Sequence, residues 1–171
     1  MKIVVCVKQV PDTTEIRINP ETGTLIRDGV PSILNPDDTN ALEQALEIKD
    51  SQPDTEVVVV TMGPPQAKEM LRECLAMGAD DAVLLSDRAL GGSDTWATSN
   101  AVAAGVRKVG GYDLIFAGRQ AIDGDTAQVG PQVAEKLGLP QVTYAEEIVE
   151  VKAGALVIKR RLEHGTEVVE C

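Results

Sequence analysis

Aromatic residues are scarce in this sequence. It has one Trp, two Tyr and one Phe among 171 residues, so its core must be built from Val, Leu, Ile and Ala. A planar ligand would also find few aromatic side chains on which to stack. We therefore expect such a ligand to be held mainly by backbone and polar groups.

Cysteine, histidine and long apolar runs are also few. The three cysteines are an odd number, lie far apart and form no CxxC pair, which argues against a disulfide framework and against a zinc site. The lone His164 lies in an expected turn without partners for a catalytic triad. No apolar run approaches the roughly 20 residues needed to cross a bilayer, and Met1 to Lys8 is typical of a strand rather than a signal peptide. We expect a cytoplasmic protein without a membrane span.

Basic residues are also few compared with acidic ones. With 16 basic against 27 acidic residues, the formal net charge is −11, which repels the phosphate backbone of nucleic acids and argues against a nucleic-acid partner. Lys159 to Arg161 is a short basic run that we interpret as a solvated strand face, with a docking surface for a partner as the alternative. Nothing resembles a nucleophile paired with its base or a GxxxxGK[ST] phosphate loop, which argues against hydrolase and kinase functions.

Strands and helices alternate along most of the chain. Short apolar runs at 2–8, 56–61, 82–86 and 114–117 predict strands, and the segments that follow them predict helices that begin near residues 36, 65 and 94 and a last helix that ends at Leu137. This order predicts a doubly wound parallel α/β sheet in three layers, α/β/α, of the adenine-nucleotide-binding type. A hairpin is expected over residues 15–26, and an antiparallel meander from Val142 onward. We divide the chain into a nucleotide-binding domain, 1–140, and a β extension, 141–171.

The strongest candidate site lies between the strand at 114–117 and the last helix. Ligands of doubly wound sheets bind beyond the carboxyl ends of the strands. Pro131 requires the helix to begin within about one turn upstream, which places unpaired amides near Asp125 to Val129, where a phosphate could bind. Carboxylates here repel phosphate unless they bind ribose hydroxyls, with Arg119 offsetting them; an acidic cap on an ordinary helix is the alternative. The candidate residues are Gly118, Arg119, Gln120, Ala121, Ile122, Asp123, Gly124, Asp125, Thr126, Ala127, Gln128 and Val129.

Three other turns precede helices at the same edge of the sheet. Glycine there allows a ligand to approach the backbone, and proline or a polar cap starts the helix. Each turn can equally be a plain strand-to-helix connection. Their candidate residues are Asn35, Pro36, Asp37 and Asp38 in the first turn, Met62 and Gly63 in the second, and Asp94 and Thr95 in the third.

Four long segments carry a resemblance to a known family. MKIVVCVKQVPD, ILNPDD, VTMGPPQAKEMLRECLAMGADDAVLLSD and AGRQAIDGDTAQVGPQVAEKLGLPQVTY together resemble the beta subunit of electron-transfer flavoproteins. The resemblance implies an α/β/α domain that pairs with an alpha subunit carrying its own FAD. It places a nucleotide along Cys6, Asn35 to Asp38, Met62 and Gly118 to Val129. Family members continue past Cys171 with a carboxyl-terminal arm, so we expect a truncated chain.

The resemblance also bears on the cofactor. The nucleotide is AMP in ordinary members and a second FAD in electron-bifurcating members, and GGSDTWATS and DGDTAQVGPQVAE look more like the bifurcating group. This implies FAD, with NADH as electron donor, ferredoxin or flavodoxin as one acceptor, and an acyl-CoA dehydrogenase reached through the alpha subunit. An AMP-binding structural subunit and a stand-alone adenine-nucleotide-binding module similar to universal stress proteins are the alternatives.

Overall fold

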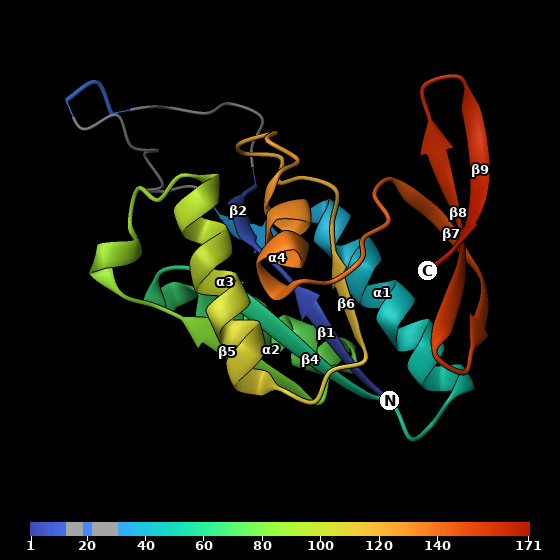
Figure 1. Cartoon of the computed structure of the whole chain (residues 1–171). Coiled ribbons are helices and arrows are strands. Elements are labelled where there is room, and N and C mark those ends of the chain that lie inside the picture. Colours follow the sequence, from blue (N-terminus) through green and yellow to red (C-terminus); the bar gives the residue numbers. More distant parts are fainter. Residues whose placement is uncertain (13–18, 22–30) are drawn as a thin grey trace.

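A four-stranded parallel sheet forms the centre of the computed structural model, which describes residues 1–12, 19–21 and 31–171 (Figure 1). Its strands are β1 (Lys2–Cys6), β4 (Glu56–Met62), β5 (Asp81–Leu85) and β6 (Leu114–Ala117), in the order β5-β4-β1-β6. The chain builds outward from β1 to β5 and then returns across the sheet to place β6 on the other side of β1. This confirms the doubly wound α/β fold, and it makes the gap between β1 and β6 the point where strand order reverses.

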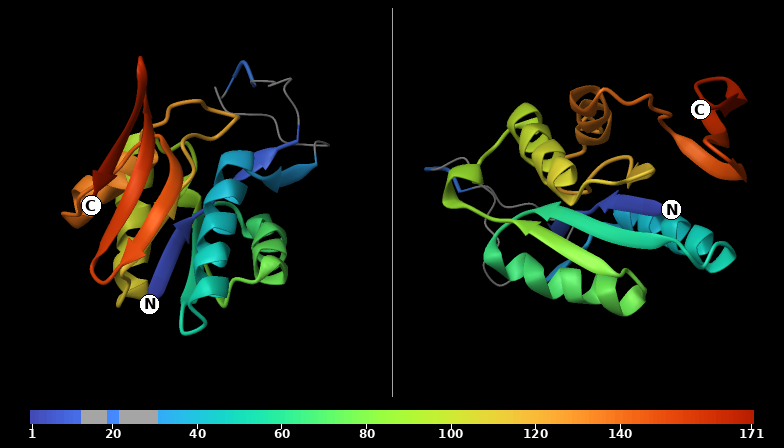
Figure 2. Two further views of the ribbon diagram at one scale, coloured as in Figure 1. Left: turned by 90° about the vertical axis from the view of Figure 1, so that its right-hand side faces the viewer. Right: turned by 60° about the horizontal axis from the view of Figure 1, so that its bottom comes forward.

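Helices cover both faces of the sheet. On one face lie α1 (Pro36–Ser51) and α2 (Lys68–Met77), and on the other α3 (Thr95–Val109) and α4 (Val129–Leu137), as the right view of Figure 2 shows. Ile3 and Val5 pack toward α1 and α2, whereas Val4 between them packs toward α3 and α4. Because both faces of the sheet are buried, its central strands are continuous apolar runs instead of alternating ones.

Shorter elements complete the connections. The helix expected from Pro65 begins as a 3₁₀ turn, η1 (Pro65–Ala67), before α2, and a second 3₁₀ turn, η2 (Arg88–Leu90), precedes α3. A two-stranded ribbon joins β2 (Gln9–Pro11) to β3 (Ser32–Leu34) in antiparallel register. The hairpin predicted over residues 15–26 falls outside the described residues, apart from 19–21.

The end of the chain forms the predicted antiparallel meander. Strands β7 (Ala145–Lys152), β8 (Ala155–Leu162) and β9 (Gly165–Glu170) pair in sequence order and lie beside the central domain (Figure 1). Leu156 and Ile158 are buried, and Ile148 and Val151 pack against the core cluster on the α1 side of the sheet. Among the described residues, none of the helices has the length and apolar character needed to cross a membrane.

Candidate functional site

The switch point between β1 and β6 brings two of the predicted segments together. Cys6 at the end of β1 lies in register with Ala117 at the end of β6. The start of α4 packs on the same place, because a Cβ added to Gly130 would lie 3.4 Å from the Cβ of Ala117. The loop 118–128 and the segment after β1 therefore share the carboxyl edge of the sheet, where ligands of this fold class bind.

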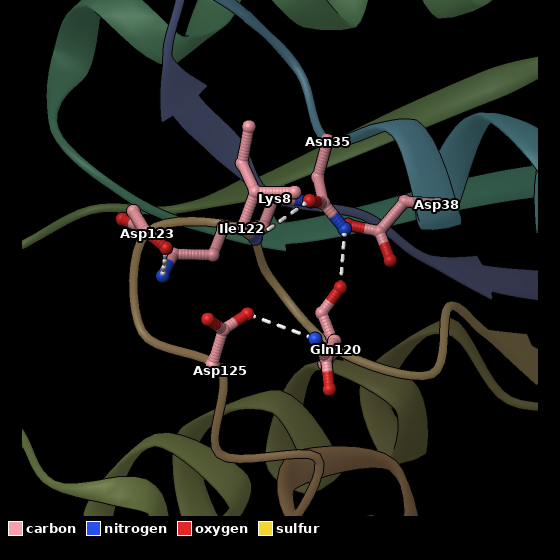
Figure 3. Close-up of polar contacts among 7 residues, drawn as sticks. All are labelled: Lys8, Asn35, Asp38, Gln120, Ile122, Asp123 and Asp125. Atoms are coloured by element: carbon pink, nitrogen blue, oxygen red, sulfur yellow. Dashed lines mark hydrogen bonds and ion pairs between the residues drawn. The ribbon is translucent and has the colours of Figure 1, made fainter. Parts of the chain in front are cut away.

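Asn35 fastens the loop 118–128 to the start of α1. Its side chain is fully buried and makes two hydrogen bonds to the loop (Figure 3): Nδ2 donates to the carbonyl of Gln120 at 2.8 Å, and Oδ1 accepts from the amide of Ile122 at 3.1 Å. A buried amide with both ends bonded fixes the loop that it contacts. The side chain of Asn35 thus holds the loop in shape, and its contact with a cofactor stays a prediction.

Asp38 makes a second connection at the same edge. One carboxylate oxygen accepts from the amide of Lys8 at 2.8 Å and the other from the amide of Gly118 at 3.1 Å. One side chain of α1 therefore joins the segments that follow β1 and β6. Gly118 has to be a glycine for this, because a Cβ there would lie 2.3 Å from Asp38 Oδ1 and 2.6 Å from the carbonyl carbon of Asp37.

Burial raises the pKa of two side chains at this edge of the sheet, the Asp38 carboxyl and the Cys6 thiol. It raises the pKa of Asp38 to about 7, and this outweighs the hydrogen bonds that lower it. Burial, with a smaller contribution from the charge of Asp38, raises the pKa of the Cys6 thiol to about 12. The Cys6 thiol is therefore protonated at neutral pH, and Cys6 lacks the thiolate that a nucleophile needs.

The start of α4 carries unpaired donors. The helix begins at Val129, with Pro131 as its third residue, which confirms the start inferred from that proline. Asp125 and Ala127 have positive φ values of 48° and 51°, a strained conformation that points to a functional constraint. Within the described residues, the amides of Thr126, Ala127 and Gln128 make no hydrogen bond. Consecutive free amides at a helix start fit a phosphate group.

The charged side chains around this loop are paired. Lys8 Nζ lies 2.6 Å from Asp123 Oδ1, and the Gln120 amide donates to Asp125 at 2.8 Å (Figure 3). Arg119, expected to offset the loop carboxylates, instead lies 3.6 Å from Asp37. Lys8 was missed in the sequence; its position as the last residue of the predicted strand 2–8, at the edge where ligands of this fold class bind, was the signal that could have identified it.

The third and fourth helix starts meet through their polar side chains. Asp94 caps α3 by accepting from the amide of Ala97 at 2.8 Å, as an ordinary cap does. Thr95 donates from its hydroxyl to Gln128 Oε1 at 3.0 Å. The candidate loop before α3 therefore lies against the start of α4.

Met62 and Gly63 stand one strand farther along the sheet edge. Met62 packs on the α3 and α4 side of the sheet, as Cys6 does, and the amide of Gly63 donates to the carbonyl of Leu85 at 3.0 Å. Both residues therefore continue the carboxyl edge from β1 toward β5. Within the described part of the chain, no group of acidic, cysteine or histidine side chains is arranged to hold a metal ion.

Comparison with known proteins gives a consistent result. A protein-family model described as "Electron transfer flavoprotein domain" matches residues 22–171. Subunit CarD of the caffeyl-CoA reductase-Etf complex of Acetobacterium woodii is 66% identical over 170 residues. The electron transfer flavoprotein subunit beta of Clostridium acetobutylicum is 65% identical over 170 residues, and the acryloyl-CoA reductase electron transfer subunit gamma of Anaerotignum propionicum is 57% identical over 174. Each alignment covers 99% of this chain and 64% of the relative, so the chain spans a little under two thirds of their length.

Proposed function

This chain belongs to the electron transfer flavoprotein family, and from that premise we propose that it is the nucleotide-binding part of a beta-type subunit that holds FAD at the β1–β6 switch point. The observation that carries the proposal is the run of unpaired amides at Thr126, Ala127 and Gln128, at the start of α4. These donors suit the phosphate portion of an adenine nucleotide. The similar sequences of subunits named for electron transfer support the same assignment.

The residues at the β1–β6 switch point have different roles in the proposed binding. The amides and the Thr126 hydroxyl hold phosphate, Asn35 and Asp38 fix the shape of the loop, and the apolar side chains of Cys6 and Met62 line the sheet edge. FAD bound here would supply the capacity to accept hydride from NADH and to pass electrons onward. The protein's own contribution would be binding and orientation.

The relatives' names indicate the kind of assembly. One belongs to a caffeyl-CoA reductase-Etf complex and another serves acryloyl-CoA reductase. By analogy we propose an alpha-type subunit and an acyl-CoA dehydrogenase as partners of this chain, with ferredoxin or flavodoxin as the low-potential acceptor. Electron bifurcation and a cytoplasmic location are parts of the same proposal.

AMP is the second candidate ligand. The free amides that favour phosphate binding are gathered at one helix start, and a single phosphate would satisfy them. An AMP-bound subunit would have a structural role in place of a redox role. The two candidates share the adenosine and its first phosphate, so they predict the same site.

Titration of ligand-free protein with FAD, AMP and FMN tests the proposal. We expect FAD and AMP to bind, FAD more tightly, and FMN to bind at least about a hundredfold more weakly than FAD, because FMN lacks the adenosine and the remaining contacts cannot replace it. The measurement is isothermal calorimetry, supported by identification of the nucleotide released when freshly purified protein is denatured. FMN binding as tightly as FAD would contradict the proposal, since the site would then recognise the ring.

A further inference from the structure

A buried carboxylate lies close to the proposed phosphate site. The side chain of Asp123 is only 3% exposed, and Asp123 precedes the first unpaired amide, that of Thr126, by three residues. A carboxylate held away from water keeps much of its field, because solvent screens it poorly. Left uncompensated, it would repel a phosphate bound at the start of α4.

Lys8 supplies a compensating charge from another part of the chain. Its ammonium lies 2.6 Å from Asp123 Oδ1, although the two residues are 115 positions apart in sequence. The backbone amide of Lys8 donates to Asp38 Oδ2 at 2.8 Å. Both the backbone and the ammonium of Lys8 are therefore held in place, the ammonium by Asp123 (Figure 3). Its side chain remains 42% exposed, so Lys8 is partly open to solvent while it pairs with a buried carboxylate.

The other acidic side chains near the loop have different partners. Asp125 accepts from the uncharged amide of Gln120, and Asp38 accepts from two backbone amides. Arg119 is directed to Asp37, at 3.6 Å. The pair of Lys8 and Asp123 places a cation on a buried carboxylate of the phosphate loop.

We propose that Lys8 determines the preference of this site for phosphorylated over unphosphorylated adenine ligands, by cancelling the charge of Asp123 beside the free amides of the loop. The inference rests on the proposed nucleotide site. Lys8 acts through Asp123 and is therefore a positioning and charge-compensating residue. The affinity for a phosphate dianion depends on the local charge, whereas the affinity for uncharged adenosine depends on the shape of the loop.

The test compares AMP with adenosine by calorimetry. Lys8→Met should weaken AMP binding about five- to thirtyfold, as expected when one unit charge is lost several ångströms from the phosphate in a partly buried site. It should change adenosine binding less than about twofold. Lys8→Arg should bind both ligands as the wild type does. The double variant Lys8→Met with Asp123→Asn should restore the wild-type ratio of adenosine to AMP dissociation constants, because both charges are then absent.

Lys2→Met is the matched control. Lys2 lies at the other end of β1 and pairs with Glu56 at 3.1 Å, so its removal changes the net charge equally, at the opposite edge of the sheet, and should leave both affinities unchanged. Equal losses for AMP and adenosine in Lys8→Met, or no loss at all, would overturn the inference while the nucleotide site stands. Wild-type protein that binds neither AMP nor FAD would overturn the proposed function and this inference with it.

Discussion

Gly118→Ala is expected to lower the free energy of unfolding by about 3 kcal/mol, at the upper end of the cost of overpacking a rigid site. The added Cβ would lie 2.3 Å from Asp38 Oδ1, 2.6 Å from the carbonyl carbon of Asp37 and 2.7 Å from the amide nitrogen of Asp38. Two of these atoms are backbone in the first turn of α1, which cannot move aside as a flexible side chain would. Relief requires β6 and α1 to separate, and separation breaks the hydrogen bond from Gly118 to Asp38. Urea unfolding monitored by circular dichroism measures the effect.

Gly124→Ala is the matched control for this prediction. Gly124 lies in the same loop, and a Cβ there would meet no atom within 4 Å. The alanine should change stability by less than about 0.5 kcal/mol, as usual for exposed substitutions. Equal stability of the two variants would show that the close contact between β6 and α1 is absent in solution.

Thr126→Val is expected to weaken the binding of FAD and AMP about ten- to 150-fold. Thr126 precedes the start of α4 and carries the first of the amides that make no hydrogen bond within the described residues. Loss of one hydrogen bond from its hydroxyl to a charged phosphate would cost about 1.5 to 3 kcal/mol. The two ligands should lose the same factor, because they share the phosphate that this group binds. Calorimetric titration of both ligands measures the loss.

Thr126→Ser separates the hydroxyl from the size of the side chain. It keeps the donor and should bind both nucleotides within about threefold of the wild type, provided that the hydroxyl is what matters. If the valine and serine variants bind with equal affinities, the Thr126 hydroxyl does not contact the phosphate. If Thr126→Val weakens FAD binding but not AMP binding, the Thr126 hydroxyl contacts the flavin half of FAD instead.

Local sequence signals predicted the elements of the fold well. The four apolar runs became the parallel strands, because a sheet buried on both faces needs uninterrupted β-branched residues. Pro131 located the start of α4, because proline is excluded from the helix interior. The antiparallel meander predicted from Val142 onward is present as β7, β8 and β9. Each of these signals acts within one turn or one strand, and so it can be read from neighbouring residues.

The internal connections of the site could not be read in this way. Asn35 bonds Gln120 and Ile122 across 85 and 87 positions, and Lys8 reaches Asp123 across 115. Nothing local distinguishes an asparagine that caps a helix from one that fastens a distant loop. The tight contact at Gly118 likewise depends on how closely β6 approaches α1. Sequence reasoning therefore predicted which segments gather at the carboxyl edge of the sheet, whereas the bonds that hold them together became visible only in the structure.

Residue-resolved hydrogen exchange of the protein with and without AMP tests the central claim most directly. We expect AMP to slow exchange of the amides of Thr126, Ala127 and Gln128, which make no hydrogen bond within the described part of the chain, because bound phosphate would accept from them. Amides of the meander, residues 145–170, should exchange at unchanged rates. Protection confined to the meander, with the start of α4 unaffected, would contradict the account and place the nucleotide elsewhere.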